Sequence, residues 1–216
     1  MHLLVVAATE GELSSLDTGA IAGRGDVEVV ITGAGMVATA AQVSRALART
    51  RFDLAINLGV CGAFDRALAL GSVVHVTSDR LPELGVEDGR TFVPAETIGL
   101  VDADTPPFTG GCLINAAPPA SITLEALPRV RAITVNTVHG DEASIAAVVG
   151  RHHPQVESME GAAFMYACLI AGVPFVQLRA VSNYVERRDR AAWKLPEAIA
   201  SLGRVATALI REVGAR

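Results

Sequence analysis

The feature that most constrains the fold is a set of short, almost wholly apolar runs that recur along the chain. Residues 3–8, 53–60 and 174–181 form three such runs, each of strand length. A continuous apolar run of this length is typical of a parallel strand that is covered on both faces. We therefore predict an α/β fold with a mixed, mostly parallel central sheet flanked by helices.

Composition and charge exclude several classes of protein. The 216 residues are 50% hydrophobic and 19% charged, and the net charge of −5 leaves no basic stripe for nucleic acid or for a membrane surface. The first residues lack the basic region of a signal peptide, and no apolar run reaches membrane-spanning length. Because no repeat or linker interrupts the chain, we expect one domain over residues 1–216, without a nucleic-acid or membrane partner.

The three cysteines also limit the possible chemistry. Cys61, Cys112 and Cys168 are widely spaced, with no Cys-x-x-Cys pair and no metal-ligand spacing. We predict reduced, mostly buried thiols in a cytoplasmic protein, and no metal site.

Two acidic clusters are candidates for a ligand site. Glu12 follows the first predicted strand, where open α/β sheets bind ligands, although the same residues also suit a solvated turn. Glu160 precedes an apolar run, residues 161–171, which has helical length and ends at Gly172. A carboxylate at a helix N-terminus is favoured by the helix dipole and accepts hydrogen bonds from ligand hydroxyls. Such an acid also caps helices, so position alone leaves both roles open.

A glycine turn follows the second predicted strand, residues 27–32. The spacing G-x-G-x-x-A begins at Gly33 and occurs in dinucleotide-binding folds. In those folds it follows the first strand, and an acid about 20 residues on ends the next strand, whereas Asp53 here begins one. We therefore predict a turn that opens a helix and suits a polar ligand edge, and we give the dinucleotide reading little weight.

The segment around Glu160 carries a resemblance. Residues 158–163 read Ser-Met-Glu-Gly-Ala-Ala, which resembles the Met-Glu-(Gly or Ala)-Ala signature of the purine nucleoside phosphorylase and nucleosidase superfamily. The resemblance implies the fold of that superfamily, a ribose-binding role for Glu160 and a sugar contact for Met159. Residues 8–13 resemble its nucleosidase branch, in which the acid that matches Glu12 activates the attacking water.

Two departures from the superfamily pattern bear on the reaction. Residues 56–63 resemble its glycine-rich strand end and place Gly59 among the expected substrate-binding residues. Bacterial phosphorylases have Arg at the position of Asn57 and Ser at that of Val60, both for phosphate. Because phosphate needs cationic or multiple N–H donors, these uncharged residues and the acidic turn at Glu12 favour water as the nucleophile.

The second departure lies at the end of the last predicted strand, where residues 179–183 read Arg-Ala-Val-Ser-Asn. Adenine nucleosidases have Asp in place of Asn183, and that Asp protonates N7 of the leaving base. An amide both donates and accepts, so Asn183 fits a 6-oxopurine, although Asn is also common in turns. With residues 182–189 and Trp193, the chain resembles the futalosine hydrolase family, which releases hypoxanthine and dehypoxanthine futalosine on a route to menaquinone.

This resemblance implies hydrolysis of a small-molecule nucleoside by water, with no metal or organic cofactor, in a homo-oligomer. Glu12 would act as base and Asn183 would stabilise charge on the departing purine. Thr137 and His139 are expected to line the base or 5′ pocket. Because futalosine carries a benzoate, the pocket is expected to contain a cation or hydroxyl donors, and the candidate residues are Arg80, Arg187 and Arg188.

Two alternatives stay open. One is another purine nucleosidase or phosphorylase, acting on inosine-like or methylthioadenosine-like substrates, and phosphate dependence of the rate identifies a phosphorylase. The other is a non-catalytic nucleoside-binding protein, which binds without turnover. The presence of both Glu12 and Glu160 argues against this second alternative.

Further expectations concern the rest of the chain. Residues 82–128 contain seven of the ten prolines and are predicted to be loops with short strands, from which Arg90 and Glu96 can reach a site. Residues 132–138 are predicted to form a strand. His75, inside an apolar strand, is predicted to be a hydrogen-bonded core histidine. Apolar spacing predicts a final helix from residue 195 to 213 with one buried face.

Overall fold

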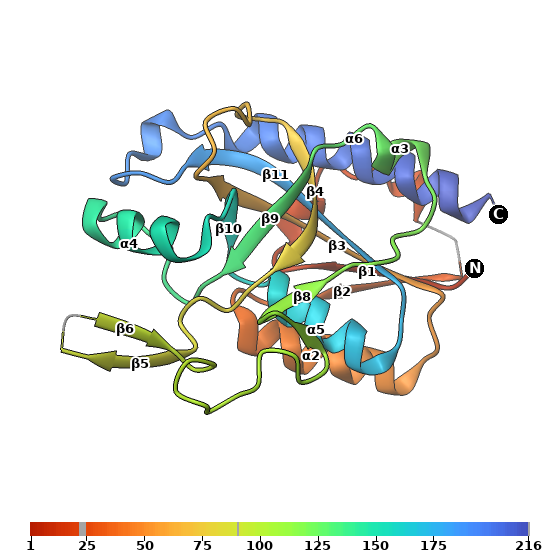
Figure 1. Cartoon of the computed structure of the whole chain (residues 1–216). Coiled ribbons are helices and arrows are strands. Elements are labelled where there is room, and N and C mark those ends of the chain that lie inside the picture. Colours follow the sequence, from red (N-terminus) through yellow and green to blue (C-terminus); the bar gives the residue numbers. More distant parts are fainter. Residues whose placement is uncertain (22–24, 90, 216) are drawn as a thin grey trace.

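The computed structural model describes residues 1–21, 25–89 and 91–215 (Figure 1). Arg90 lies outside the described residues. Within them, a nine-stranded mixed sheet has the order β2-β1-β3-β10-β9-β4-β8-β7, and β11 pairs with both β3 and β4. The strands of the sheet are β1 (Leu3–Ala7), β2 (Val27–Ile31), β3 (Leu54–Ala63), β4 (Val73–Asp79), β7 (Phe108–Thr109), β8 (Cys112–Ile114), β9 (Arg129–Thr134), β10 (Val156–Ser158) and β11 (Phe175–Tyr184).

Part of this sheet closes on itself. β3 pairs with β10 and β11, β11 pairs with β4, β4 pairs with β9, and β9 pairs with β10. β1 and β2 extend the sheet from β3 by parallel pairing, while β10–β3, β11–β4 and β4–β8 are antiparallel. The mixed sheet predicted from the sequence is therefore confirmed.

Helices cover both faces of the sheet (Figure 1). Leu4 and Val6 of β1 pack with α2 and α5 on one face, while Leu3 and Val5 pack with α6 on the other. Alternating side chains of one strand thus enter two separate cores, which explains why the strand is apolar without interruption. The helices are α1 (Glu10–Leu13), α2 (Met36–Arg49), α3 (Ile122–Glu125), α4 (Glu142–His152), α5 (Gly161–Ala171) and α6 (Leu195–Gly214), with 3₁₀ turns η1 (Thr18–Ala20) and η2 (Arg190–Ala192).

The sequence locates α5 and α6 well, because α5 is apolar on all sides and α6 carries one apolar stripe. The prediction for the strand at residues 132–138 is wrong in its bounds. β9 begins at Arg129, which pairs with His75, and ends at Thr134, because its partner β10 ends at Ser158. Residues 82–128 hold the short strands expected there, including the hairpin of β5 (Gly85–Asp88) and β6 (Thr91–Pro94).

The prediction that His75 is hydrogen-bonded is also wrong. Its side chain is buried on β4, and neither ring nitrogen has a hydrogen-bond partner among the described residues. Burial, with a smaller contribution from the Arg129 charge, lowers the pKa of His75 to about 4. The ring is therefore neutral and packs as an apolar group, because no acceptor is available to hold a charge.

Among the described residues, no helix combines the length and the apolar character needed to cross a membrane. The same part of the chain contains no group of three or more His, Cys, Asp or Glu side chains arranged to hold a metal ion.

A glycine in α6 positions the turn that carries Glu12. A Cβ added at Gly203 would lie 2.2 Å from the backbone oxygen of Ser15, just beyond α1. The missing side chain thus lets α6 pack directly against the backbone that follows α1. Any larger residue has to move that backbone.

We predict that Gly203→Ala lowers the free energy of unfolding by about 2 kcal/mol, because the added methyl group overpacks this contact. Gly150→Ala in α4 is the matched control, since nothing lies within 4 Å of a Cβ at Gly150. That change should instead stabilise by roughly 0.5–1 kcal/mol, as expected for Gly to Ala in a helix. Urea unfolding of both variants measures the two values. Equal effects of the two substitutions would contradict the proposed contact.

Candidate active site

The predicted site residues lie at the carboxyl ends of neighbouring strands. α1 follows β1, the turn before α2 follows β2, and α5 follows β10. β11 pairs with β3 so that Arg179 is opposite Gly59 and Asn183 is opposite Gly62. β1, β3 and β11 run parallel, so their carboxyl ends lie at one edge, where open α/β sheets bind ligands, whereas β10 runs antiparallel to β3.

Glu12 is held by backbone donors. The N–H groups of Ala8 and Thr9 each donate to Oε2 at 3.0 Å, and the N–H of Val60 donates to Oε1 at 3.2 Å. The hydroxyl of Thr9 also donates to Oε2, at 3.3 Å. Since a carboxylate accepts hydrogen bonds, these four donors fix its orientation between β1 and β3, and no cation among the described residues hydrogen-bonds to it.

Gly59 leaves room for two charged groups. A Cβ at this position would lie 2.0 Å from Nη1 of Arg179 and 3.0 Å from Oε1 of Glu12. Gly59 is therefore the place where the guanidinium and the carboxylate approach the same point of β3. The sequence indicated an acidic site lacking a cation, and the structure adds the positive charge of Arg179 beside Glu12.

Arg179 belongs to a buried polar network. The side chain is 1% exposed, and it donates to Asn57 Oδ1 at 2.5 Å and to Gln177 Oε1 at 3.1 Å. Gln177 in turn donates to Asp79 Oδ2 at 3.2 Å. Burial raises the pKa of Asp79 to about 6, although hydrogen bonds from Gln177 and Thr134 and the Arg179 charge act to lower it.

This network ends at the start of α5. The hydroxyl of Thr134 donates to Asp79 at 3.0 Å and accepts from the N–H of Ala162 at 2.7 Å. A Cβ at Gly161 would lie 2.3 Å from Oε1 of Gln177. Gly161 therefore allows the first turn of α5 to rest on the network, and this contact sets the position of Glu160.

Glu160 stands at the N-cap position of α5 and is 8% exposed. Its Oε1 accepts a hydrogen bond of 2.9 Å from the N–H of Gly35. Gly33 and Gly35 have φ values of 84° and 94°, which only glycine adopts readily. The glycine turn thus orients Glu160 through its backbone. Met159, the neighbouring residue, is half-buried.

A cavity of about 250 Å³ lies at the ends of β3 and β11. Five residues named in the sequence analysis line it, namely Thr137, His139, Asn183, Arg187 and Arg188, while Glu12, Gly59, Met159 and Glu160 are not among its lining residues. Gly62, three residues after Gly59 on β3, also lines it. The remaining lining residues are Val138, Gly140, Glu157, Tyr184, Glu186, Asp189 and Trp193.

The amide of Asn183 is oriented by its neighbours. Its Oδ1 accepts from the hydroxyl of Ser182 at 2.8 Å, and its Nδ2 donates to the carbonyl of Tyr184 at 2.9 Å. An amide nitrogen carries two hydrogens and the oxygen carries two lone pairs. One donor and one acceptor position of Asn183 therefore stay available for a ligand in the cavity.

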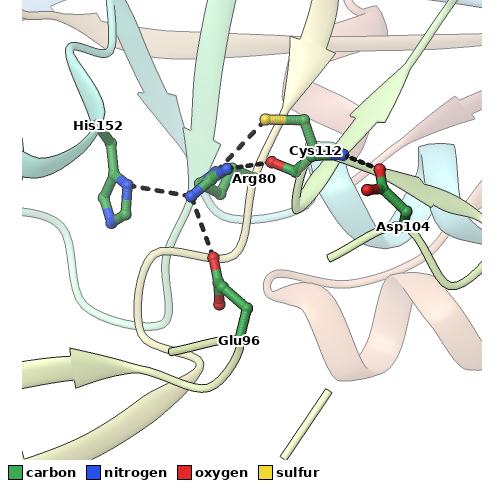
Figure 2. Close-up of polar contacts among 6 residues, drawn as sticks. Arg80, Glu96, Asp104, Cys112 and His152 are labelled. Atoms are coloured by element: carbon green, nitrogen blue, oxygen red, sulfur yellow. Dashed lines mark hydrogen bonds and ion pairs between the residues drawn. The ribbon is translucent and has the colours of Figure 1, made fainter. Parts of the chain in front are cut away.

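Arg80 is placed elsewhere. It lines a different cavity, with Glu96 and His152 (Figure 2). Its guanidinium donates to Glu96 Oε1 at 3.3 Å, to the carbonyl of Gly110 at 2.5 Å and to Cys112 Sγ at 3.4 Å. The structure therefore does not bring Arg80 to the cavity of Asn183, because this side chain ties the segment of residues 96–112 to the end of β4.

Two charged residues at the site have no role in the sequence prediction. Arg179 lies in the segment of residues 179–183 that the sequence analysis named, and Glu157 directly precedes the motif of residues 158–163, but neither was assigned a role there. The structure buries them, at 1% and 3% exposure. A charged residue within an apolar strand could have indicated these roles, because a charge that is buried there needs a hydrogen-bond or ion-pair partner.

Fold and site together define an α/β protein with a cavity of about 250 Å³ and two carboxylates that follow strands of the sheet. The chain belongs to the phosphorylase superfamily, whose family model matches residues 13–212. This match confirms the superfamily that the motifs around Glu12 and Glu160 predicted.

Curated proteins that are similar in sequence narrow the class of enzyme within this superfamily. Futalosine hydrolase of Streptomyces coelicolor is 34% identical over 158 residues, covering 70% of this chain and 62% of that protein. Futalosine hydrolase of Thermus thermophilus is 29% identical over 190 residues, covering 85% and 80%. A 5′-methylthioadenosine/S-adenosylhomocysteine nucleosidase of Colwellia psychrerythraea is 29% identical over 171 residues, covering 73% and 67%. These proteins are nucleosidases, which are N-glycosyl hydrolases, and the predicted enzyme class is confirmed.

Solved structures confirm the fold. Futalosine hydrolase of Helicobacter pylori superposes with a TM-score of 0.78 at 12% identity, over 98% of both chains. A 5′-methylthioadenosine/S-adenosylhomocysteine nucleosidase of Neisseria meningitidis, in complex with methylthio-immucillin-A, gives a TM-score of 0.77 at 18% identity, over 98% of this chain and 99% of that one.

Proposed function

We propose that the protein hydrolyses the N-glycosidic bond of futalosine, releasing hypoxanthine and dehypoxanthine futalosine as a cytoplasmic step of menaquinone biosynthesis. The observation that carries this proposal is the neutral amide of Asn183 in one cavity with Arg187 and Arg188. The amide matches a 6-oxopurine, and the two cations match an anionic 5′ arm. The identity of 34% to futalosine hydrolase of Streptomyces coelicolor supports the same substrate.

The residues at the strand ends suit a dissociative hydrolysis. As the C1′–N9 bond breaks, the sugar becomes positive and the purine becomes negative. Glu12, fixed by backbone donors, would accept a proton from the water that attacks C1′. Glu160 would accept hydrogen bonds from the ribose hydroxyls, with Met159 against the sugar. Asn183 would donate to the 6-oxo group, where negative charge develops.

Other parts of the proposal concern the whole protein. We infer that residues 1–216 act as one domain, because β11 near the end of the chain pairs with both β3 and β4. We also propose a homo-oligomer that needs no metal or organic cofactor. The exposed apolar side chains Tyr166 and Ile170 on α5 and Val37 on α2 support an oligomer contact.

A second candidate function is hydrolysis of methylthioadenosine-like nucleosides. The 29% identity to the Colwellia psychrerythraea nucleosidase favours it. Asn183 opposes it, because an amide cannot supply the proton that a carboxyl group gives to an adenine leaving group.

We predict that the purified protein releases hypoxanthine from futalosine at the same rate with and without phosphate. Among the described residues that line the cavity, Arg187 and Arg188 are the cations, and we assign them to the 5′ arm, while the buried Arg179 is bonded to Asn57 and Gln177. Futalosine, inosine and methylthioadenosine are compared, and the free base is quantified by chromatography. Adenine release as the main activity would support the second candidate. A requirement for phosphate would contradict hydrolysis.

We predict that Glu12→Gln lowers kcat by at least about 100-fold, because the amide cannot accept the proton of water. Glu10→Gln on the same turn is the matched control, since Glu10 is exposed. Circular dichroism should show an unchanged fold for both variants. Wild-type turnover by Glu12→Gln would remove Glu12 from the mechanism.

We predict that Arg187→Gln raises KM for futalosine about 10-fold, because it removes a charge-assisted hydrogen bond to the benzoate. KM for inosine, which lacks this arm, should change less than about twofold. Arg190→Gln is the matched control, because Arg190 is exposed on the same segment but does not line the cavity. An equal rise in KM for futalosine and inosine would show that Arg187 does not bind the 5′ arm.

A further inference from the structure

A buried ion pair faces the cavity of Asn183. Glu157 is 3% exposed, and both of its carboxylate oxygens contact one residue, His139. Oε1 accepts from the backbone N–H of His139 at 3.1 Å, and Oε2 lies 2.6 Å from its Nδ1. Two bonds to one residue hold the backbone and the ring together, so the imidazole has a fixed orientation.

The pair lies close to the residue that we propose binds the purine. His139, Glu157 and Asn183 all line the same cavity. Gly62 lies between them, since a Cβ at Gly62 would be 3.2 Å from Nδ2 of Asn183 and 3.6 Å from Cγ of Glu157. The Phe64 ring packs edge-on against the imidazole, with 6.1 Å between ring centroids. The imidazole therefore stands at the wall of the base-binding region.

The hydrogen bond to Glu157 determines which ring nitrogen serves the cavity. A carboxylate only accepts, so Nδ1 carries the hydrogen of the 2.6 Å bond. Nε2 makes no hydrogen bond with any described residue, and the ring is 14% exposed. With Nδ1 turned to Glu157, Nε2 is the ring nitrogen left to face a ligand.

The reaction needs such a donor. The departing hypoxanthine accepts a proton when the C1′–N9 bond breaks, but the amide of Asn183 has no acidic proton, and Glu12 accepts one from water. A histidine held by a carboxylate is the arrangement that general acids commonly use. His139 thus has the chemistry that Asn183 lacks, at the same wall of the same cavity.

We propose that His139 is the catalytic acid that protonates the leaving purine at N7, an inference that rests on the function proposed above. Glu157 is then the positioning residue of His139. The proton moves from Nε2 to N7 while the electron pair of the C1′–N9 bond passes to the base. Water adds its oxygen to C1′ and gives its proton to Glu12. That proton returns through solvent to His139, so water and the nucleoside yield free base and free sugar.

Other charged groups face the pair from neighbouring elements. The segment after β11 contributes four charged side chains to the cavity, and β10 contributes one, Glu157. On the loop of His139 itself, Asp141 caps α4 by accepting from Ala143 and Ser144. The four side chains are Glu186, Arg187, Arg188 and Asp189. Their formal charges cancel, and Glu157 is the charged group that bonds to the ring.

His139→Ala tests the proposal in the full-length protein with futalosine as substrate. The expected result is a fall in kcat of about 100-fold with KM within about threefold of wild type. Added imidazole should restore part of the rate, because it can occupy the space of the missing ring. The pH profile of kcat should lose the limb that falls toward high pH, as expected when the general acid of a reaction is removed.

His139→Gln is a second variant, for use if His139→Ala unfolds. Its side-chain amide can still donate to Glu157, so the fold should be preserved. Glu157→Gln should move the high-pH limb to lower pH without removing it. Glu142→Gln, three residues from His139 and outside the cavity, is the matched control. Wild-type turnover with undiminished kcat in both His139 variants, or an unchanged high-pH limb, would overturn this inference alone. Absence of hypoxanthine release by the wild-type protein would overturn the proposed function and this inference together.

Discussion

The site depends on a buried guanidinium that must find hydrogen-bond acceptors inside the protein. A charge that is 1% exposed is costly unless it is fully paired, so the partners of Arg179 have fixed orientations. Asn57 turns its oxygen to Arg179 and its nitrogen to the carbonyl of Val6. Gln177 turns its oxygen to Arg179 and its nitrogen to Asp79. The nitrogen of each amide thus donates one hydrogen bond and its oxygen accepts one. The four strands that carry these residues, β1, β3, β4 and β11, are thereby held in register.

Two glycines allow this network to contact the segments that carry Glu12 and Glu160. At Gly59 the absence of a side chain lets Arg179 approach β3 beside Glu12, and at Gly161 it lets α5 begin directly on Gln177. Close approach of backbone to a buried polar group is possible only where no Cβ intervenes. The two carboxylates proposed to bind water and ribose are therefore positioned from opposite ends of one network.

The cavity proposed to hold the base is organised differently. It is walled by Asn183 at the end of β11, by Glu157 on β10 and by the segment that follows Asn183. Its polar groups bond to adjacent residues, as Ser182 does to Asn183, and to one another, as His139 does to Glu157. These bonds are not part of the Arg179 network.

The sequence by itself determined the α/β class, the long helices and the motifs that carry Glu12, Glu160 and Asn183, because apolar periodicity and local residue order encode them. It did not determine which charges are buried together. Glu157 lies three residues before Glu160, but its pairing with His139 arises only when the end of β9 meets β10. Partners far apart in the chain are selected by strand pairing, so only the tertiary structure decided how the site is charged.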